Sequence, residues 1–303
     1  MKKIIITESQ AKFLKQYLNE ERDLRLYSFD WDDNILNMPT EIYLKDNMGN
    51  VVGMSTHEFA EYRHLIGKEP FKYKGKMVVG YDEDPYRDFK DPNAFIRDAK
   101  IAIENEDFAP SIGKFIEALV YANPLSINTA RGHDPKVLKK GLRFFIDKVL
   151  TEDEKEEMAE NIKDAYQYEG NYPQDFLNKI NNLNTNQLID FYLDSRVKYY
   201  PVSSDKFGEK SGLPVTGGAA NPEYAKQVAL SHFLQTNFED VKDLIKGGKY
   251  NKISLGFSDD DLKNVNAMVN FIDRELSKVY PEVHFVVYDT SEGGKKKIVI
   301  EKD

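Results

Sequence analysis

The chain of 303 residues contains no cysteine, one tryptophan and five histidines. Without cysteine it can form neither disulfides nor thiolate metal sites, and this fits a reducing compartment. The histidines show no metal-ligand spacing such as H-E-x-x-H. We therefore expect ordinary surface or half-buried roles for His57, His64, His232 and His284, and also for His133, although His133 follows the Thr129 motif and could have another role.

Long hydrophobic runs are also missing from the sequence. No segment approaches the roughly twenty apolar residues that cross a bilayer, and the apolar run at residues 4–6 is too short for a secretory signal. We therefore expect a soluble, cytoplasmic protein without a membrane partner. The pattern G-x-x-x-x-G-K-[ST] is absent too, which argues against a P-loop kinase.

Acidic residues outnumber basic ones, 51 against 42, which gives a net charge of −9. This surplus argues against general binding to nucleic acids, although it leaves room for a local basic surface. The length allows a sizeable core, and the chain can hold either one core with insertions or two independent domains.

The most informative segment of the sequence ends in three carboxylates. Residues 24–29 alternate in a way that predicts a short strand, and Asp30, Asp32 and Asp33 follow it. Aspartate is unfavourable in strands and costly to bury unpaired, so such a cluster needs a compensating cation. A bound Mg²⁺ would neutralise the acids, and a carboxylate held there could attack a phosphorus atom. The alternative is an acidic turn that only caps a strand.

Two further predicted strands end in polar residues. Residues 123–129 lead into Thr129, Ala130 and Arg131, where a hydroxyl and backbone N–H groups could cradle a phosphate. Arg131 could pair with that phosphate through its planar fork, or could instead bridge to a core aspartate. Residues 252–258 lead into Asp259 and Asp260. Parallel strands place their carboxyl ends at one edge of a sheet, so we expect these tips to meet there.

In their order along the chain, these strand-end motifs resemble those of the haloacid dehalogenase-like (HAD) phosphohydrolase superfamily. Phe29-Asp30-Trp31-Asp32 matches its first motif, Ile127-Asn128-Thr129 matches its second, and residues 256–260 look like its fourth. For the lysine that opens a later helix, Lys226 is the best match and Lys206 the alternative. The acidic segments are also similar to uncharacterised HAD-like proteins of large tailed phages, which would place the protein in the host cytoplasm or the virion.

The resemblance implies an α/β fold, with a Rossmannoid parallel sheet as the core and an inserted cap. It also implies a Mg²⁺-dependent phosphatase in which Asp30 attacks the phosphoryl group and forms an aspartyl-phosphate. Asp32 would protonate the leaving oxygen and then activate water. Thr129 and Lys226 would hold the phosphate oxygens, with Ala130 and Arg131 completing the substrate-binding loop.

In the same resemblance, Mg²⁺ is held by Asp30, by the backbone carbonyl of Asp32, and by Asp259 or Asp260. Two departures bear on catalysis. Asp33-Asn34 replaces the usual Gly-Thr and adds a negative charge beside the metal, and Phe257 stands where an acid would follow Gly256.

Substrate and partners follow from the same resemblance. We expect a phosphorylated small molecule or a nucleotide as substrate. One alternative is a phage structural or cargo protein that keeps the scaffold without the chemistry. The other is a phosphatase acting on nucleic-acid ends, which would need a basic groove that the net charge does not indicate.

Spacing between the motifs predicts how the chain is organised. About a hundred residues separate Asp30 from Thr129, more than a strand crossover needs. A Gly-containing turn predicts a hairpin at residues 41–52, and residues 283–300 read as two paired strands. An amphipathic helix is predicted after Asp261, with one apolar face formed by Leu262, Val265, Val269, Ile272 and Leu276.

The predicted segments are an N-terminal helical segment (1–23, with a helix from Thr7 to Lys15), core segments (24–36, 111–150 and 216–303), an inserted cap (37–110) and a largely helical second insertion (151–215).

The inserted cap is predicted to choose the substrate, because it is rich in aromatic and charged residues. Tyrosines there could stack on a base or sugar, although core packing is the simpler explanation; they are Tyr62, Tyr73, Tyr81 and Tyr86.

Overall fold

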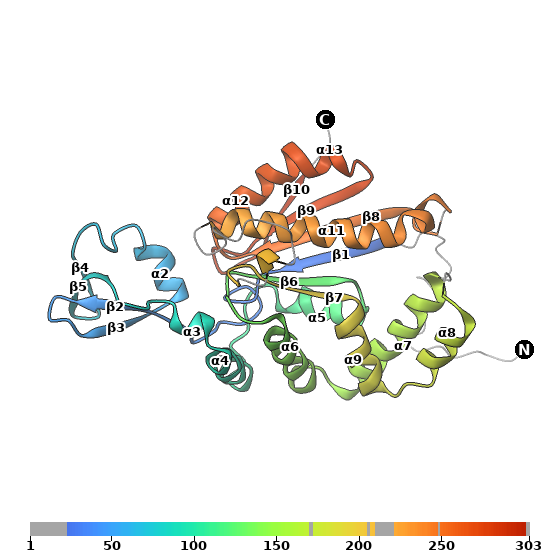
Figure 1. Cartoon of the computed structure of the whole chain (residues 1–303), viewed down its shortest axis with the longest axis horizontal. Helices are drawn as coiled ribbons and strands as arrows, with labels where there is room; N and C mark the ends of the chain where they lie inside the picture. The colour runs from blue at the N-terminus through green and yellow to red at the C-terminus, as the bar shows by residue number, and fades with distance from the viewer. Residues whose placement is uncertain (1–22, 170–171, 205–206, 210–220, 248, 301–303) are drawn as a thin grey trace, which may run out of the picture.

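The computed structural model describes residues 23–300 apart from 170–171, 205–206, 210–220 and 248 (Figure 1). The predicted helix from Thr7 to Lys15 and the alternative lysine, Lys206, lie outside the described residues. Within the described part of the chain, no helix is both long and apolar enough to cross a membrane.

A six-stranded sheet forms the centre of the molecule, with the strand order β10-β9-β8-β1-β6-β7 (Figure 1). Five strands are parallel, and β10 runs antiparallel to β9. Their bounds are β1 (Asp23–Phe29), β6 (Leu125–Thr129), β7 (Val197–Pro201), β8 (Lys252–Asp259), β9 (Val283–Asp289) and β10 (Lys296–Ile300). The three strands predicted to carry the site are therefore immediate neighbours in a mixed α/β fold with a mostly parallel sheet.

Helices cover both faces of this sheet, as expected for parallel strands that are apolar on both sides (Figure 1). Phe29 and Ile127 pack into one helical layer, and Leu255 and Phe257 pack into the other. The first layer consists of α4 (Pro92–Glu104), α5 (Ile112–Val120), α6 (Pro135–Val149), α7 (Glu152–Glu169), α8 (Gln174–Asn181) and α9 (Thr185–Ser195). The second consists of α11 (Pro222–Lys246), α12 (Leu262–Phe271), the π-helical turn η1 (Ile272–Leu276) and α13 (Ser277–Val279).

The helix after the last acidic strand matches its predicted apolar face in part. Val265, Ile272 and Leu276 are buried in the second layer, whereas Leu262 is 51% exposed, so that part of the prediction is wrong. Asp261 is the N-cap of α12 and accepts a hydrogen bond from the Lys263 N–H. Leu262 consequently lies at the first position of the helix, on its solvent side.

A second, four-stranded antiparallel sheet lies beside the main body, with the order β3-β2-β5-β4 (Figure 1). We call β2 to β5 together with α2, residues 41–81, the small sheet. Its elements are β2 (Glu41–Asp46), β3 (Val51–Ser55), α2 (Thr56–Tyr62), β4 (Phe71–Tyr73) and β5 (Lys76–Tyr81). Ile42, Leu44 and Met54 belong to its own core. The predicted hairpin is confirmed by the pairing of β2 with β3, and Gly49 in its turn has a φ of +83°.

The packing shows which elements belong to the main body. α4 lies within the predicted segment 37–110, yet Phe95 and Ala99 are buried in the first helical layer. The short helix α3 (Arg87–Lys90) connects the small sheet to α4. β7 lies within the predicted segment 151–215 and pairs with β6, so that segment adds a strand to the central sheet. The predicted pairing of the last two strands is confirmed by β9 and β10.

Candidate functional site

Three neighbouring strands bring acids and a hydroxyl to one edge of the central sheet. In β1, Phe29 is in register with Ile127 of β6 and with Ser258 of β8. Asp30 follows directly, and its N–H donates to the Ser258 carbonyl at 2.9 Å. Thr129 and Asp259 end the two flanking strands. The carboxyl ends of the parallel strands thus collect the groups that the sequence marks as candidates.

Lys226 places a buried positive charge between two of these acids. Its Nζ lies 2.7 Å from Asp30 Oδ2 and 2.7 Å from Asp259 Oδ2, and its side chain is 1% exposed. The lysine sits near the start of α11, and its carbonyl accepts a hydrogen bond from Asn128 of β6. Burial acts to lower the pKa of Lys226, but the two carboxylates outweigh it and raise the pKa above its ordinary value. The ammonium therefore stays charged.

One lysine does not balance the acids around it. Burial raises the pKa of Asp30 to about 7 against the pull of Lys226, and Asp259 and Asp32 add to the rise. Burial also raises the pKa of Asp260 well above its ordinary value, with Asp259 and Asp30 as the next causes. The cluster therefore favours either a bound proton or a second cation.

The geometry of these acids fits a divalent metal ion. Carboxylate oxygens of Asp30, Asp259 and Asp260 all lie within 4.8 Å of one another. Asp259 already accepts hydrogen bonds from Lys226, Asn264 and the Asp261 N–H. Within the described part of the chain, Asp260 accepts no hydrogen bond and makes no ion pair. Hard cations such as Mg²⁺ prefer carboxylate oxygens, so Asp260 is the acid best placed to gain one as a partner.

Asp32 is not one of the three grouped acids and forms an ion pair with Arg131. Arg131 Nε lies 2.9 Å from Asp32 Oδ2, and Arg131 Nη2 lies 2.5 Å from Asp32 Oδ1. The Thr129 hydroxyl also donates to Asp32 Oδ2 at 3.3 Å and accepts from the Arg131 N–H. Of the two roles considered for Arg131, the structure shows the bridge to an aspartate. Ala130, between Thr129 and Arg131, is exposed.

Asn34 organises the loop after β1, and sequence analysis missed this role. Its Nδ2 donates to the carbonyls of Asp30 and Ser258, and its Oδ1 accepts from the hydroxyls of Ser111, Ser258 and Thr290. The side chain is fully buried. Asn34 thereby fixes the acid-bearing loop to β8 and to the start of α5. Its position within the first motif was the one available signal, and it was read only as a departure.

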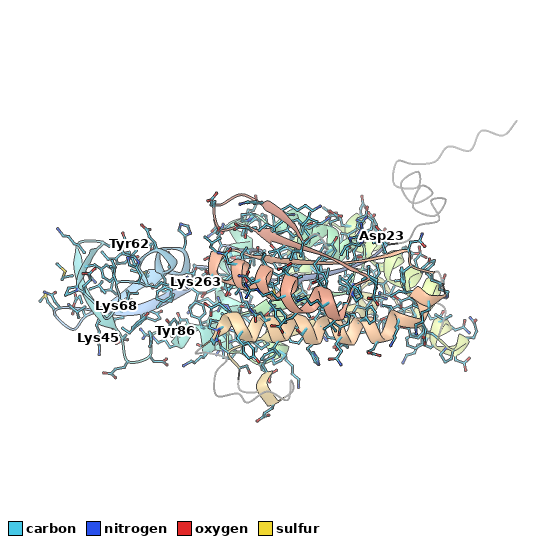
Figure 2. The ribbon with its side chains drawn as sticks, turned by 90° about the horizontal axis from the view of Figure 1, so that it is seen from above. Asp23, Lys45, Tyr62, Lys68, Tyr86 and Lys263 are labelled. Carbon is cyan, nitrogen blue, oxygen red and sulfur yellow. The ribbon has the colours of Figure 1, made fainter. Side chains whose placement is uncertain are left out.

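Two contacts join the small sheet to the site. The Thr56 hydroxyl, at the start of α2, donates to Asp33 Oδ2. Arg63, just after α2, pairs with Asp261 at 3.0 Å. Figure 2 shows Lys263, at the start of α12, on the side of the main body that faces the small sheet. Burial raises the pKa of Asp33 to about 6, against the hydrogen bond from Thr56. The small sheet thus contacts the loops that follow both β1 and β8.

The tyrosines of the small sheet differ in what they can contact. Tyr73 is buried and donates a hydrogen bond of 2.5 Å to Glu58, and Tyr62 stacks on Phe71. These two support the core of the small sheet, which is the simpler of the two predicted roles. Tyr81 and Tyr86 are partly exposed and pack against each other, so they remain accessible to a ligand.

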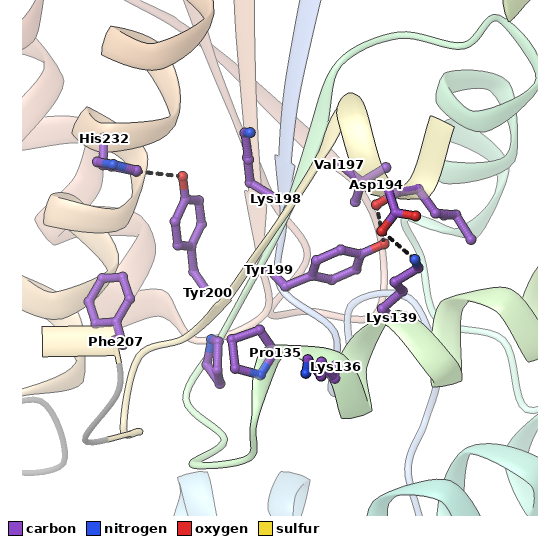
Figure 3. A pocket seen from close by; sticks show the side chains of 12 residues that line it. Pro135, Lys136, Lys139, Asp194, Val197, Lys198, Tyr199, Tyr200, Phe207 and His232 are labelled. Carbon is purple, nitrogen blue, oxygen red and sulfur yellow. Dashed lines mark hydrogen bonds and ion pairs between the residues drawn. The ribbon is translucent and has the colours of Figure 1, made fainter. Parts of the chain in front are cut away.

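A cavity of about 320 Å³ lies elsewhere, along the edge strand β7 between α6 and α11 (Figure 3). Tyr200 points toward α11 and hydrogen-bonds His232 at 2.8 Å, while Tyr199 points the opposite way, toward Asp194 and Lys139 (Figure 3). None of the clustered acids lines this cavity. It is therefore separate from the site at the strand ends.

No protein-family model, no curated protein and no solved structure matches the chain.

Proposed function

We propose that the protein is a Mg²⁺-dependent phosphatase that hydrolyses a phosphate monoester through an aspartyl-phosphate on Asp30. The observation that carries this proposal is the buried arrangement of Asp30, Lys226 and Asp259, with Asp260 beside them and without a hydrogen bond or ion pair among the described residues. A carboxylate held by a fixed ammonium at the end of a strand is positioned as a nucleophile. The uncompensated acids supply the ligands for a metal.

In the first step, an oxygen of Asp30 forms a bond to phosphorus while the bond from phosphorus to the ester oxygen breaks. Asp32 enters this step as the neutral acid and gives its proton to the leaving oxygen. In the second step, water attacks the phosphorus and gives its proton to Asp32, and the bond to Asp30 breaks. Inorganic phosphate leaves and both carboxyl groups return to their starting state.

The surrounding residues bind the transferring group. Lys226, which contacts Asp30, and the Thr129 hydroxyl, which contacts Asp32, would donate hydrogen bonds to phosphoryl oxygens. Asp30, Asp259 or Asp260, and the carbonyl of Asp32 would hold Mg²⁺, which offsets the charge on the phosphoryl group. The small sheet acts as the cap, because it contacts the loops after both acidic strands through Thr56 and Arg63.

The test is the hydrolysis of p-nitrophenyl phosphate with MgCl₂ or EDTA. We expect turnover only with Mg²⁺, and a loss of at least about 1,000-fold in kcat for Asp30→Asn, since this change removes the nucleophile. Asp273→Asn, at an exposed position on η1, is the matched control and should keep wild-type activity. Activity of Asp30→Asn within about tenfold of wild type would contradict the nucleophile assignment.

A non-catalytic scaffold, such as a phage structural or cargo protein, is the second candidate. The observation that favours it is that Lys226 forms ion pairs with both Asp30 and Asp259 and so neutralises part of the acidic cluster. In that case Mg²⁺ would still stabilise the fold, but no phosphate ester tested would turn over with either wild type or Asp30→Asn.

A further inference from the structure

Arg131 is a fully buried cation at the junction of the site and the small sheet. Its guanidinium is 0% exposed and lies 5.0 Å from the centres of the Phe89 and Phe95 rings. The small sheet joins the main body through two connections, residues 37–40 before β2 and residues 82–91 after β5. Arg131 contacts both connections as well as Asp32.

Arg131 contacts the first connection through Thr40. Arg131 Nη2 donates to Thr40 Oγ1 at 2.6 Å, and that hydroxyl donates to Asp98 Oδ2 at 2.8 Å. Thr40 and Asp98 are both fully buried, so the hydroxyl has a fixed position between the arginine and α4. The nitrogen that binds Thr40 is the same Nη2 that binds Asp32 Oδ1. A shift of Thr40 would therefore move the group that orients Asp32.

Arg131 contacts the second connection through Phe89. Its ring lies against the Arg131 guanidinium, and its carbonyl accepts the Gly132 N–H at 3.1 Å. The neighbouring Asp88 accepts a hydrogen bond from Tyr43 of β2, and Tyr43 N–H donates to the Pro85 carbonyl. These bonds tie the second connection to β2, the strand that directly follows the first connection. The two connections would consequently move together if the small sheet moved relative to the main body.

We propose that Arg131 is a positioning residue that transmits the position of the small sheet to the side chain of Asp32. This inference rests on the proposed function, because Asp32 matters for proton transfer only if a phosphate ester is cleaved. Arg131 fixes Asp32 through two nitrogens of a planar fork, and one of them also holds Thr40. When the cap moves, the fork turns and Asp32 turns with it toward or away from the leaving oxygen.

The first experiment compares two esters that differ in their leaving group, p-nitrophenyl phosphate and phenyl phosphate. A misplaced proton donor harms the ester with the poorer leaving group more, because that oxygen depends more on protonation. For Arg131→Lys and Thr40→Val we expect kcat/KM to fall at least about tenfold on phenyl phosphate and less than about threefold on p-nitrophenyl phosphate. Equal losses on both esters would show a structural role only and overturn the proposal.

The second experiment follows amide hydrogen exchange and does not depend on activity. Arg131→Lys and Thr40→Val should speed exchange in peptides covering residues 30–40 and 82–91, at both connections. Arg143→Gln, which removes ion pairs on the surface of α6, should leave those peptides unchanged. Unchanged exchange at either connection in the Thr40→Val protein would overturn the coupling. If wild type hydrolyses neither ester, the phosphatase proposal fails, and exchange alone decides whether Arg131 links the connections to Asp32.

Discussion

Replacing Lys226 by methionine removes a buried positive charge from the acidic cluster, and we predict a large loss of stability without metal. The lysine Nζ lies 2.7 Å from carboxylate oxygens of both Asp30 and Asp259, and the Lys226 and Asp259 side chains are almost completely buried. Methionine retains an unbranched apolar stem but has no charge. Two buried carboxylates would therefore lose their common partner.

The size of the loss follows from the burial of the pair. Removing one member of a buried ion pair costs about 3–5 kcal/mol, because the remaining charge is left uncompensated. Asp30 can relieve part of this by binding a proton, since burial already raises its pKa to about 7. We therefore expect the lower end, about 3 kcal/mol near neutral pH. At about 2 °C per kcal/mol for a chain of this size, Tm should fall by about 6 °C in EDTA.

Urea unfolding followed by the fluorescence of Trp31 measures this loss. Trp31 is the one tryptophan of the chain, is fully buried and follows Asp30 directly. Lys163→Met is the matched control, because its i,i+3 pair with Glu160 on α7 is solvent-exposed and should cost no more than about 0.5 kcal/mol. Mg²⁺ should restore more stability to Lys226→Met than to wild type. A loss below about 1 kcal/mol in EDTA would refute the view that a charged lysine compensates these acids.

Two further predictions concern other carboxylates. Asp260→Asn should remove most of the stabilisation by Mg²⁺, which at roughly a hundredfold excess over Kd is about 2.7 kcal/mol in wild type. Thermal melts in MgCl₂ and EDTA measure it with Asp273→Asn as the control, and an undiminished rise would speak against the metal site. Burial acts to raise the pKa of Glu58, yet hydrogen bonds from Tyr73, Ser55 and Lys74 outweigh it and lower the pKa to about 2. Its contribution to the small sheet is therefore present above the ordinary pKa of about 4.5 and is lost as the pH falls toward 2. Near-UV circular dichroism against pH should show a smaller loss of signal at low pH for Glu58→Gln than for wild type. An unchanged pH profile would contradict this role of Glu58.

The sequence predicts the central part of the fold because its signals are local. Each of β1, β6 and β8 is a short apolar run that ends in or is followed by acids or a hydroxyl, and both predicted strand pairs are joined by polar turns that contain glycine. β7 is not followed by acids or by a glycine-containing turn, and β4 has only three residues, so neither strand was expected. α4 belongs to the main body because of the long-range contacts of its buried side chains, and no local sequence pattern predicts these contacts.

The site shows the same limit, since its decisive contacts are long-range. Lys226 was predicted from the order of the motifs, but order alone could not show that its ammonium bridges Asp30 and Asp259. The hydroxyls that bind Asn34 lie 77, 224 and 256 positions away along the chain. A lone asparagine in a loop has no periodicity or spacing that would indicate such partners. Only the folded sheet brings them together.

Asp33 and Asn34 give the departure from the expected Gly-Thr a structural explanation. Asn34 donates to two carbonyls and accepts from three hydroxyls, which a threonine could not do with its single hydroxyl. Asp33 has a φ of +54°, in the left-handed region that glycine enters at least cost, and it uses its carboxylate to bind Thr56. Asn34 thus anchors the acid-bearing loop to the main body, and Asp33 anchors it to the small sheet. A loop held from both sides fixes the backbone that carries Asp30 and Asp32. The carboxylate of Asp33 makes a contact that a glycine could not make.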